Sequence, residues 1–370
     1  MSSPYYLLLL LLLLLLHHLP ASSTATHQYN VLSLIADDLR PEFSGAYGQA
    51  QVKTPNVDAF AARSLVFAKA YCQQAVCGPS RNSFMTGRRP HHTNVVQGGA
   101  TGDDFRKAGI DANGVRGSDW TTLPGHFKNA GYTTLGGGKT FHPNAPKNFD
   151  YPRSWSTDMA SRDTHGQGYF DFSYFLNNHS KPYNGGLPIS HPCPGVAHPT
   201  GEGPKPNGNS LGGPIAVWCA LNISDEHFYD SNLADNTIER LRYGASKFNS
   251  TGTPFFVMSG FARPHTPWRV PRRFWDMYST EDIVLAKHKF PPSDMPGVAW
   301  MAHSFWNTTD GSVWPMNVTT PLEDDVARLA RHAYYASVSF LDYQIGRVLD
   351  ELDALGMAES TIVTLHGDHG

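Results

Sequence analysis

The sequence predicts an α/β protein built around a largely parallel sheet. Short apolar runs that suit strands alternate along the chain with segments that have helical spacing. These runs are continuously apolar, as is typical of strands that are buried on both faces of a parallel sheet. Polar clusters follow several of them directly, where open parallel sheets place their ligands. At 370 residues with 40% hydrophobic composition, the chain is long enough for one large domain or two smaller ones.

The first half of the chain alternates these patterns in order. An apolar run over 31–36 predicts a buried strand that ends abruptly in Asp37-Asp38. Thr54-Pro55 marks the start of a helix over 56–64, because proline suits the first helical turn. A second helix is expected over 79–85. We then expect a helix over 123–130, a strand over 132–135 and a glycine-rich turn at Gly136-Gly137-Gly138.

The second half contains two irregular stretches. Residues 143–220 are crowded with Pro, Gly, Asn and His and indicate a long set of loops, and residues 280–320 are again irregular. Between them we expect a helix over 227–248 and a strand over 255–259. The residues from Thr320 to Glu323 predict a capping box, with proline at the first helical position, for a helix that extends to about 355. A final strand over 361–365 leads into Asp368-His369.

The N-terminus and the sequons suggest export. Ten consecutive leucines, followed by small residues, predict a secretory signal peptide over 1–25. That run is too short to span a bilayer comfortably, although an uncleaved anchor is the alternative, and we expect no stable membrane span elsewhere. Glycosylation is predicted at Asn178, Asn222, Asn249, Asn307 and Asn317. In an oxidising compartment we expect a disulfide between Cys193 and Cys219.

The charge of the whole chain excludes one class of partner. Its formal net charge is −3 with histidine neutral, so no general positive field exists to attract nucleic acid. Any anion therefore has to bind at a local cluster of positively charged side chains.

Polar residues follow four predicted strands or turns. These clusters are Asp37-Asp38, Lys139 with His142, Arg263 with His265, and Asp368-His369. In an open parallel sheet such ends face one crevice, so distant segments can converge there. Carboxylates from two strands would form a hard-oxygen site suited to Ca²⁺ or Mg²⁺. Taken singly, an aspartate pair can be a helix cap or a turn, and a lone Lys or His can be a solvated side chain.

Cys77 lies in a segment whose parts fit one another. Pro79 and Ser80 begin a helix whose free N–H groups favour an anion, and Arg81 adds a positive charge one turn from the thiol. An anionic substrate would be held beside a thiol that can act as a nucleophile. The alternatives are a buried structural cysteine or a disulfide with Cys72.

The stretch from Cys77 to Arg81, followed by Thr86-Gly87-Arg88, resembles the C-x-P-S-R…T-G-R signature of type I sulfatases. In that family the cysteine is oxidised to formylglycine by a formylglycine-generating enzyme in the endoplasmic reticulum. The resemblance extends over 30–370 through IADDLRPEFSGAYG, GGGKTFHP and RPHTPWRVPRRF. It implies the alkaline-phosphatase-like fold, in which a large mixed, mostly parallel sheet is sandwiched by helices.

The resemblance also implies roles for individual residues. Asp37, Asp38, Asp368 and His369 would hold one Ca²⁺ together with the formylglycine oxygen derived from Cys77. Arg81 and Lys139 would steady the formylglycine hydrate and the sulfate, with Lys139 and His265 contacting substrate. His142 and His265 would serve as acid and base. Within the family, the chain is most similar to the lysosomal or secreted enzymes that remove the 2-O-sulfate of iduronate in dermatan and heparan sulfate.

Several alternatives stay open beside this expectation. The family places a further lysine and a C-terminal subdomain beyond residue 370, so residues 26–370 are expected to be an incomplete catalytic domain. Another glycosaminoglycan or polysaccharide sulfatase, or an arylsulfatase, is the nearest alternative. A catalytically silent truncated product that binds sulfated glycans is a second. A phosphoesterase of the wider superfamily is a third, and it predicts Ser or Thr where this chain has Cys77.

Overall fold

The computed structural model describes residues 28–96, 104–142, 145–156, 218–222, 224–266, 268–299, 305–306, 313–314 and 319–370. The predicted signal peptide, Cys193 and the sequons at Asn178, Asn307 and Asn317 lie outside these residues, and so does the side chain of Cys219. In the described part of the chain, no helix has the length and apolar character needed to cross a membrane.

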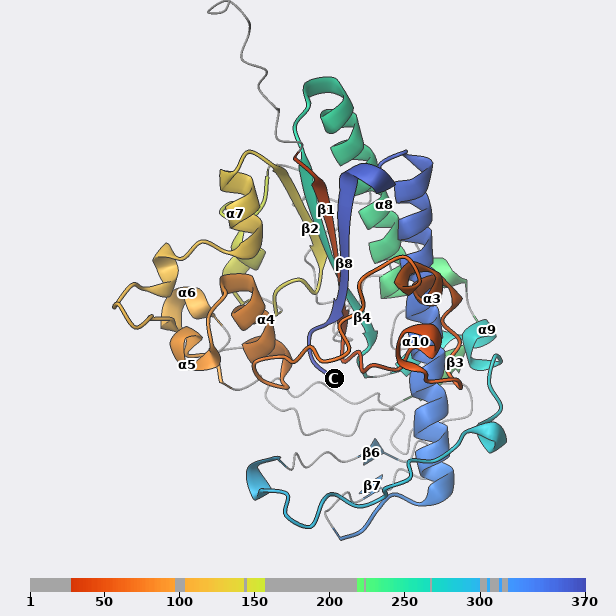
Figure 1. The fold of residues 1–370 in the computed structure, drawn as a ribbon. Helices are drawn as coiled ribbons and strands as arrows, with labels where there is room; N and C mark the ends of the chain where they lie inside the picture. The colour runs from red at the N-terminus through yellow and green to blue at the C-terminus, as the bar shows by residue number, and fades with distance from the viewer. Residues whose placement is uncertain are drawn as a thin grey trace, which may run out of the picture.

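A parallel sheet forms the centre of the molecule (Figure 1), which confirms the predicted fold class. Its strand order is β2-β4-β1-β8, and every neighbouring pair is parallel. The strands span Asn30–Asp37 (β1), Thr133–Gly138 (β2), Phe255–Pro264 (β4) and Thr361–Gly367 (β8). β1 and β4 are buried along their whole length, as their continuous apolar runs predict.

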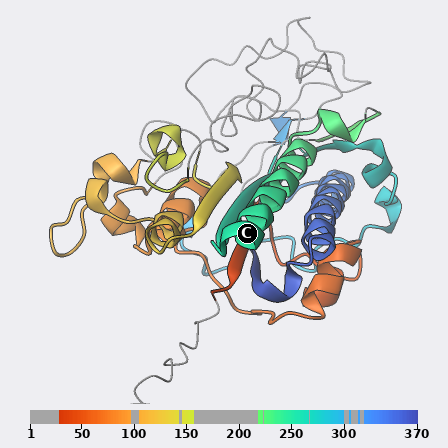
Figure 2. The same cartoon turned by 90° about the horizontal axis from the view of Figure 1, so that it is seen from above.

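Helices cover both faces of this sheet (Figures 1 and 2). α8 (Tyr229–Thr251) and α10 (Asp324–Ala354) lie on one face, while α4 (Cys77–Thr86) and α7 (Leu123–Asn129) lie on the other. Successive side chains of a strand point to opposite faces. Leu32 and Leu34 of β1 accordingly join the core against α8 and α10, whereas Val31 and Ile35 join the second core on the α4 side.

The three glycines predicted as a turn belong instead to β2, so that prediction was wrong. A Cβ atom on Gly136 would lie 2.5 Å from the Trp155 ring, and one on Gly138 would lie 2.3 Å from the backbone oxygen of Gly260. Glycine occurs here because neighbouring groups approach the strand too closely for a side chain. Sequence alone does not distinguish this use of glycine from flexibility.

Several predicted helix ends also differ from those observed. α10 begins at Asp324 after an extended Glu323 whose side chain forms no capping hydrogen bond, so the predicted capping box is wrong. Asp324 and Asp325 place negative charge in the first turn instead, where the helix dipole favours it. α3 (Pro55–Ala61) ends before residue 64, and α4 begins two residues before Pro79.

Short elements complete the described structure. β3 (Trp218–Leu221) pairs in parallel with β5 (Trp268–Pro271), and β6 (Phe305–Trp306) pairs antiparallel with β7 (Val313–Trp314). The short α-helices are α2 (Ser44–Tyr47), α5 (Pro90–Thr93), α6 (Phe105–Ala108) and α9 (Arg272–Trp275). Single 3-10 turns occupy Gly117–Asp119, Lys147–Asp150, Asp225–His227, Thr280–Asp282, Gly297–Ala299 and Ala358–Ser360.

Candidate active site and metal centre

The carboxyl ends of the four central strands bring the predicted site residues to one edge of the sheet. Asp37 is the last residue of β1, and Asp368 comes directly after β8. Lys139 directly follows β2, and His265 directly follows β4. Because all four strands are parallel, these residues arrive at the same edge from segments more than three hundred residues apart.

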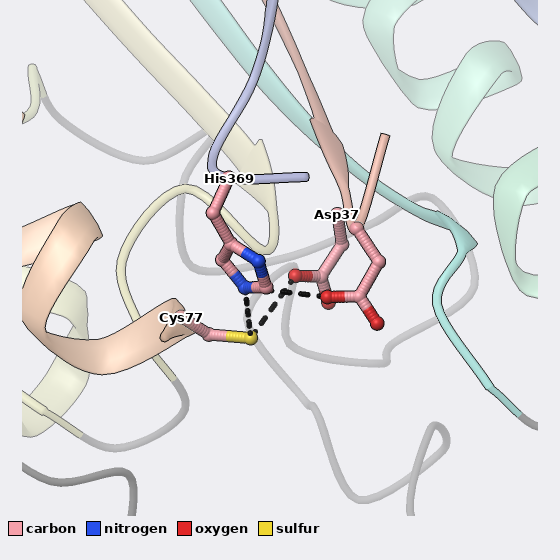
Figure 3. A group of neighbouring side chains, drawn as sticks. Asp37, Cys77 and His369 are labelled. Carbon is pink, nitrogen blue, oxygen red and sulfur yellow. Dashed lines mark hydrogen bonds and ion pairs between the residues drawn. The ribbon is translucent and has the colours of Figure 1, made fainter. Parts of the chain in front are cut away.

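Cys77 meets this edge from the first turn of α4. Its Sγ lies 3.3 Å from Oδ1 of Asp37 and 3.1 Å from Nε2 of His369 (Figure 3). Ligand atoms of Asp37, Asp38, Cys77 and His369 all lie within 4.8 Å of one another. Burial, followed by the negative charge of Asp37, raises the pKa of the Cys77 thiol well above its usual value. The arrangement therefore keeps the thiol protonated beside carboxylates.

Arg81 joins the carboxylates from one turn further along α4. Its Nε lies 3.0 Å from Oδ2 of Asp368, and its Nη2 lies 3.3 Å from Oδ1 of Asp37. Its Nη1 donates to the backbone oxygens of Lys139 and Thr140. The guanidinium is fully buried. Arg81 thus links strands β1, β2 and β8 in addition to supplying positive charge.

Lys139 pairs with the opposite oxygen of Asp37. Burial alone would lower the pKa of Lys139, but the negative charge of Asp37 more than offsets this and raises it. Burial likewise acts to raise the pKa of Asp37, yet Lys139, His265 and Arg81 together hold it well below the usual range. Asp37 is therefore ionised in the folded protein.

The pKa of Asp368 shifts in the opposite direction from that of Asp37. Its Oδ1 accepts backbone N–H groups from Asp38 at 3.0 Å and His369 at 2.9 Å. Burial and the nearby charge of Asp37 nevertheless raise the pKa of Asp368 to about 6, in spite of Arg81. Burial is the larger cause of this raised pKa, and the charge of Asp37 adds to it.

His265 and His369 both face Asp38. Nε2 of His369 lies 3.2 Å from Oδ1 of Asp38, and Nε2 of His265 lies 3.9 Å from Oδ2. Nδ1 of His265 lies 2.5 Å from the Thr266 oxygen, which requires a proton on that nitrogen. Nε2 is therefore the atom that gains or loses a proton. Burial lowers the pKa of His265.

The remaining predicted residues that the structure describes are His142, Cys72, Asn222 and Asn249. His142 comes three residues after Lys139 and its backbone pairs with Ala145, so its proton-transfer role stays a prediction. Cys72 is exposed, and both it and Cys77 are free thiols, so the alternative of a disulfide between them is wrong. Asn222 and Asn249 are exposed, as glycosylation would require.

Comparison with known proteins identifies the chain's relatives. A family model described as Sulfatase matches residues 29–370. The chain belongs to the sulfatase family. It is 34% identical over 355 residues to iduronate 2-sulfatase of Mus musculus and 33% identical over 354 residues to iduronate 2-sulfatase of Homo sapiens. These alignments cover 94% of this chain but 55% and 56% of those proteins, so this sulfatase chain spans about half the length of the curated relatives.

More distant structures share the fold. The phosphonate monoester hydrolase of Agrobacterium radiobacter aligns with a TM-score of 0.58 at 21% identity, covering 93% of this chain and 63% of that chain. The enzyme SpPMH from Silicibacter pomeroyi aligns with a TM-score of 0.54 at 18% identity, with the same coverage. The sulfatase chain therefore has a sheet and helical layers common to this wider group.

The donor set of this sulfatase site fits a calcium ion only in part. Asp37 and Asp368 pair with the permanent cations Arg81 and Lys139, whereas Asp38 lies beside His369, so a further cation would balance the charge of the three aspartates. Carboxylate oxygens suit Ca²⁺, whereas a thiol sulfur suits softer metals. An oxygen in place of the Cys77 sulfur would improve the fit to Ca²⁺, with His369 still contributing a nitrogen. The oxidation of Cys77 stays a prediction.

Two further residues contact this site that were not predicted as site residues. The Ser80 hydroxyl donates to the backbone oxygen of Asp368. The Tyr334 hydroxyl, from α10, donates to the backbone oxygen of Asp38 at 2.9 Å. Ser80 lies within the cysteine motif, which could have suggested it, whereas Tyr334 is separated from Asp38 by 296 positions. Only the folded structure brings Tyr334 to the site.

Proposed function

We propose that this chain carries the active site of a sulfatase in which Cys77 is oxidised to formylglycine, and that the substrate is the 2-O-sulfate of iduronate in dermatan and heparan sulfate. The observation that carries this proposal is the position of the Cys77 thiol, 3.3 Å from Asp37 and 3.1 Å from His369. Membership of the sulfatase family supports hydrolysis of a sulfate ester.

Two groups would supply chemistry that the encoded side chains lack. Hydrated formylglycine supplies a hydroxyl nucleophile for the sulfur atom and a second hydroxyl that allows the aldehyde to re-form. Calcium, held by Asp37, Asp38, Asp368, His369 and the oxidised residue 77, supplies positive charge next to that nucleophile. Asp37 and Asp368 are buried, so their geometry is fixed before substrate binds, whereas Asp38, Cys77 and His369 are half-buried.

Lys139 and Arg81 neutralise charge around the sulfate. A sulfate monoester is an anion that repels nucleophiles, so fixed cations at this position lower the barrier. Arg81 already contacts Asp37 and Asp368, and we propose that it acts mainly by holding these carboxylates beside residue 77. Lys139 pairs with Asp37, and we propose that it also reaches the sulfate.

His265 is proposed as the acid that protonates the departing sugar oxygen. Its Nδ1 proton is held by the Thr266 oxygen, so Nε2 would carry the transferred proton. Asp38, 3.9 Å from Nε2, favours the protonated form, while burial makes the ring release its proton readily. His142, three residues beyond Lys139, is proposed as the base that accepts the proton when the aldehyde re-forms.

The sugar specificity rests on the relatives. Two iduronate 2-sulfatases are 34% and 33% identical to the chain, whereas choline-sulfatase of Rhizobium meliloti and arylsulfatase of Clostridium perfringens are each 25% identical. This difference favours iduronate over a choline or an aryl ester. The same relationship supports a lysosomal or secreted location, with the signal peptide, the glycosylation sites, the Cys193–Cys219 disulfide and the formylglycine-generating enzyme as parts of the proposal.

The first test is mass spectrometry of the tryptic peptide over 70–81 from protein secreted by a eukaryotic host. Conversion of Cys77 to the aldehyde or its hydrate removes the sulfur from the peptide. A Cys77→Ser variant is the matched control, because it presents a hydroxyl that cannot re-form an aldehyde and should be inactive. A peptide that retains its thiol would favour the silent truncated product that binds sulfated glycans without turnover.

The second test separates substrates. Protein with converted Cys77 is assayed on a disaccharide with 2-O-sulfated iduronate and on a generic aryl sulfate. The proposal expects a kcat/KM at least tenfold higher on the iduronate substrate. Activity on the aryl ester alone would reject the iduronate assignment while leaving the sulfatase chemistry in place. Activity on a phosphate monoester alone would instead favour the phosphoesterase alternative.

A further inference from the structure

We infer that the hydroxyl of Tyr334 positions Asp38 as a metal ligand, and that the residue thereby acts on calcium affinity without touching the metal or the substrate. This inference rests on the proposed function, because that proposal assigns Asp38 to the calcium ion. The reasons lie in the backbone of Asp38, in the hydrogen bonds of the Tyr334 hydroxyl, and in the segments that Tyr334 connects.

Asp38 has an unusual backbone conformation for a residue other than glycine. Its φ is +60°, in the left-handed region that L side chains rarely adopt. In an extended strand, the side chains of Asp37 and Asp38 would point to opposite faces of the sheet. The left-handed turn ends the strand and breaks this alternation, so both carboxylates reach the group around Cys77 and His369. The two adjacent ligands therefore depend on an unfavourable conformation that other contacts have to maintain.

Tyr334 supplies contacts on the C-terminal side of Asp38. Its hydroxyl donates to the backbone oxygen of Asp38 and accepts the backbone N–H of Arg40, both at 2.9 Å. On the N-terminal side, the Asp38 N–H donates to Asp368. The peptide groups on both sides of Asp38 are thus fixed, the preceding one by Asp368 and the following one by Tyr334.

Tyr334 also connects Asp38 to the segment that carries His265. The Trp268 ring packs edge-on against the Tyr334 ring, with centroids 5.9 Å apart at 85°. Trp268 Nε1 donates to the backbone oxygen of Pro264, at 2.5 Å, directly before His265. Through Tyr334, helix α10 therefore contacts both the segment that contains Asp38 and the segment that carries His265. Residues that orient a ligand in this way typically change metal affinity when they are substituted.

The test is a Tyr334→Phe variant of the full chain with converted Cys77. This change keeps the ring and its packing on Trp268 and removes only the hydroxyl. Calcium affinity is measured by isothermal titration and, independently, from the dependence of Tm on calcium concentration. We expect the calcium Kd to rise about tenfold. Excess calcium should restore kcat, while KM for the sulfate ester stays unchanged, because the substrate contacts are intact.

The neighbouring tyrosine provides the matched control. Tyr335 is 1% exposed and lies on the same helix turn, but its ring packs near Tyr278 in the main core and its hydroxyl does not bond to the Asp38 segment. Tyr335→Phe should leave the calcium Kd unchanged. If Tyr334→Phe melts at a lower temperature, the slope of Tm against calcium concentration still reports its affinity.

The outcomes separate this inference from the proposed function. Wild-type protein that binds calcium, together with Tyr334→Phe protein that binds it equally tightly, overturns the positioning role alone. A higher calcium Kd in both tyrosine variants also overturns it, because the loss of affinity would then come from a change in the core packing of α10. Wild-type protein that shows no calcium binding overturns the metal assignment in the proposed function, and the positioning role with it.

Discussion

Arg81 illustrates how one side chain can organise a charged site. Its guanidinium is fully buried and donates to two carboxylates and two backbone oxygens, which come from three different strands or their ends. Burial of a charge is costly unless each polar atom has a partner, and here the planar fork of arginine supplies several donors at once. A lysine has one nitrogen and cannot reach the same set. The site therefore requires arginine, and a positive charge alone is not sufficient.

An Arg81→Lys variant should accordingly lose stability. Removing the fork leaves at least one buried carboxylate without its partner, and we expect the free energy of unfolding to fall by about 3 kcal/mol. Urea denaturation followed by circular dichroism measures this change. Arg89→Lys, at an exposed position on the same segment, is the control and should change stability by less than about 0.5 kcal/mol. Equal stability of both variants would show that the buried network contributes little.

Strands β2 and β4 approach each other unusually closely where they enter the site. A Cβ atom on Gly260 of β4 would lie 2.0 Å from the backbone oxygen of Lys139, a distance that real contacts do not reach. The two strands are paired up to Gly138 and Gly260, and the backbone N–H of Lys139 donates to the Gly260 oxygen at 2.7 Å. The position of the Lys139 side chain therefore depends on the absence of a side chain on the next strand.

A Gly260→Ala variant tests this dependence. The added methyl group has to displace the Lys139 backbone, so we expect a loss of about 1–3 kcal/mol in stability. Activity at a temperature where the variant is still folded should fall at least about tenfold, because Lys139 moves relative to Asp37. Gly297→Ala, where a Cβ would meet nothing within 4 Å, is the control for both measurements. A variant with normal activity would argue against a role for this close approach.

At the scale of the whole molecule, the fold class and most of the site residues could be predicted because they depend on local patterns. Continuous apolar runs indicated buried parallel strands, and the polar residues after them were correctly expected at one edge of the sheet. The strand order β2-β4-β1-β8 could not be derived, because it depends on pairings between distant segments. For the same reason Tyr334 was missed, and the glycines of β2 were misread because their neighbours were unknown.

The proposed calcium ligands span almost the entire chain, from Asp37 to His369, and this has a consequence for stability. An ion that binds only the folded protein stabilises it by about 2.7 kcal/mol at one hundred times its Kd, which for a chain of this length corresponds to a rise in Tm of about 3–4 °C. The charge of Asp37 close to Asp368 should increase this dependence, because calcium relieves the repulsion between the two carboxylates.

Thermal melting in calcium and in EDTA, at matched ionic strength, measures this linkage. Asp37→Asn removes the charge of one ligand and should abolish most of the rise in Tm that calcium causes. This expectation holds whatever the effect of the substitution on the Tm in EDTA. Asp350→Asn, at an exposed position of α10, should leave the rise unchanged. Identical melting of the unsubstituted protein in calcium and in EDTA would mean that the edge of the sheet does not bind this ion. The carboxylates would then have to be explained by their pairing with Arg81 and Lys139 alone.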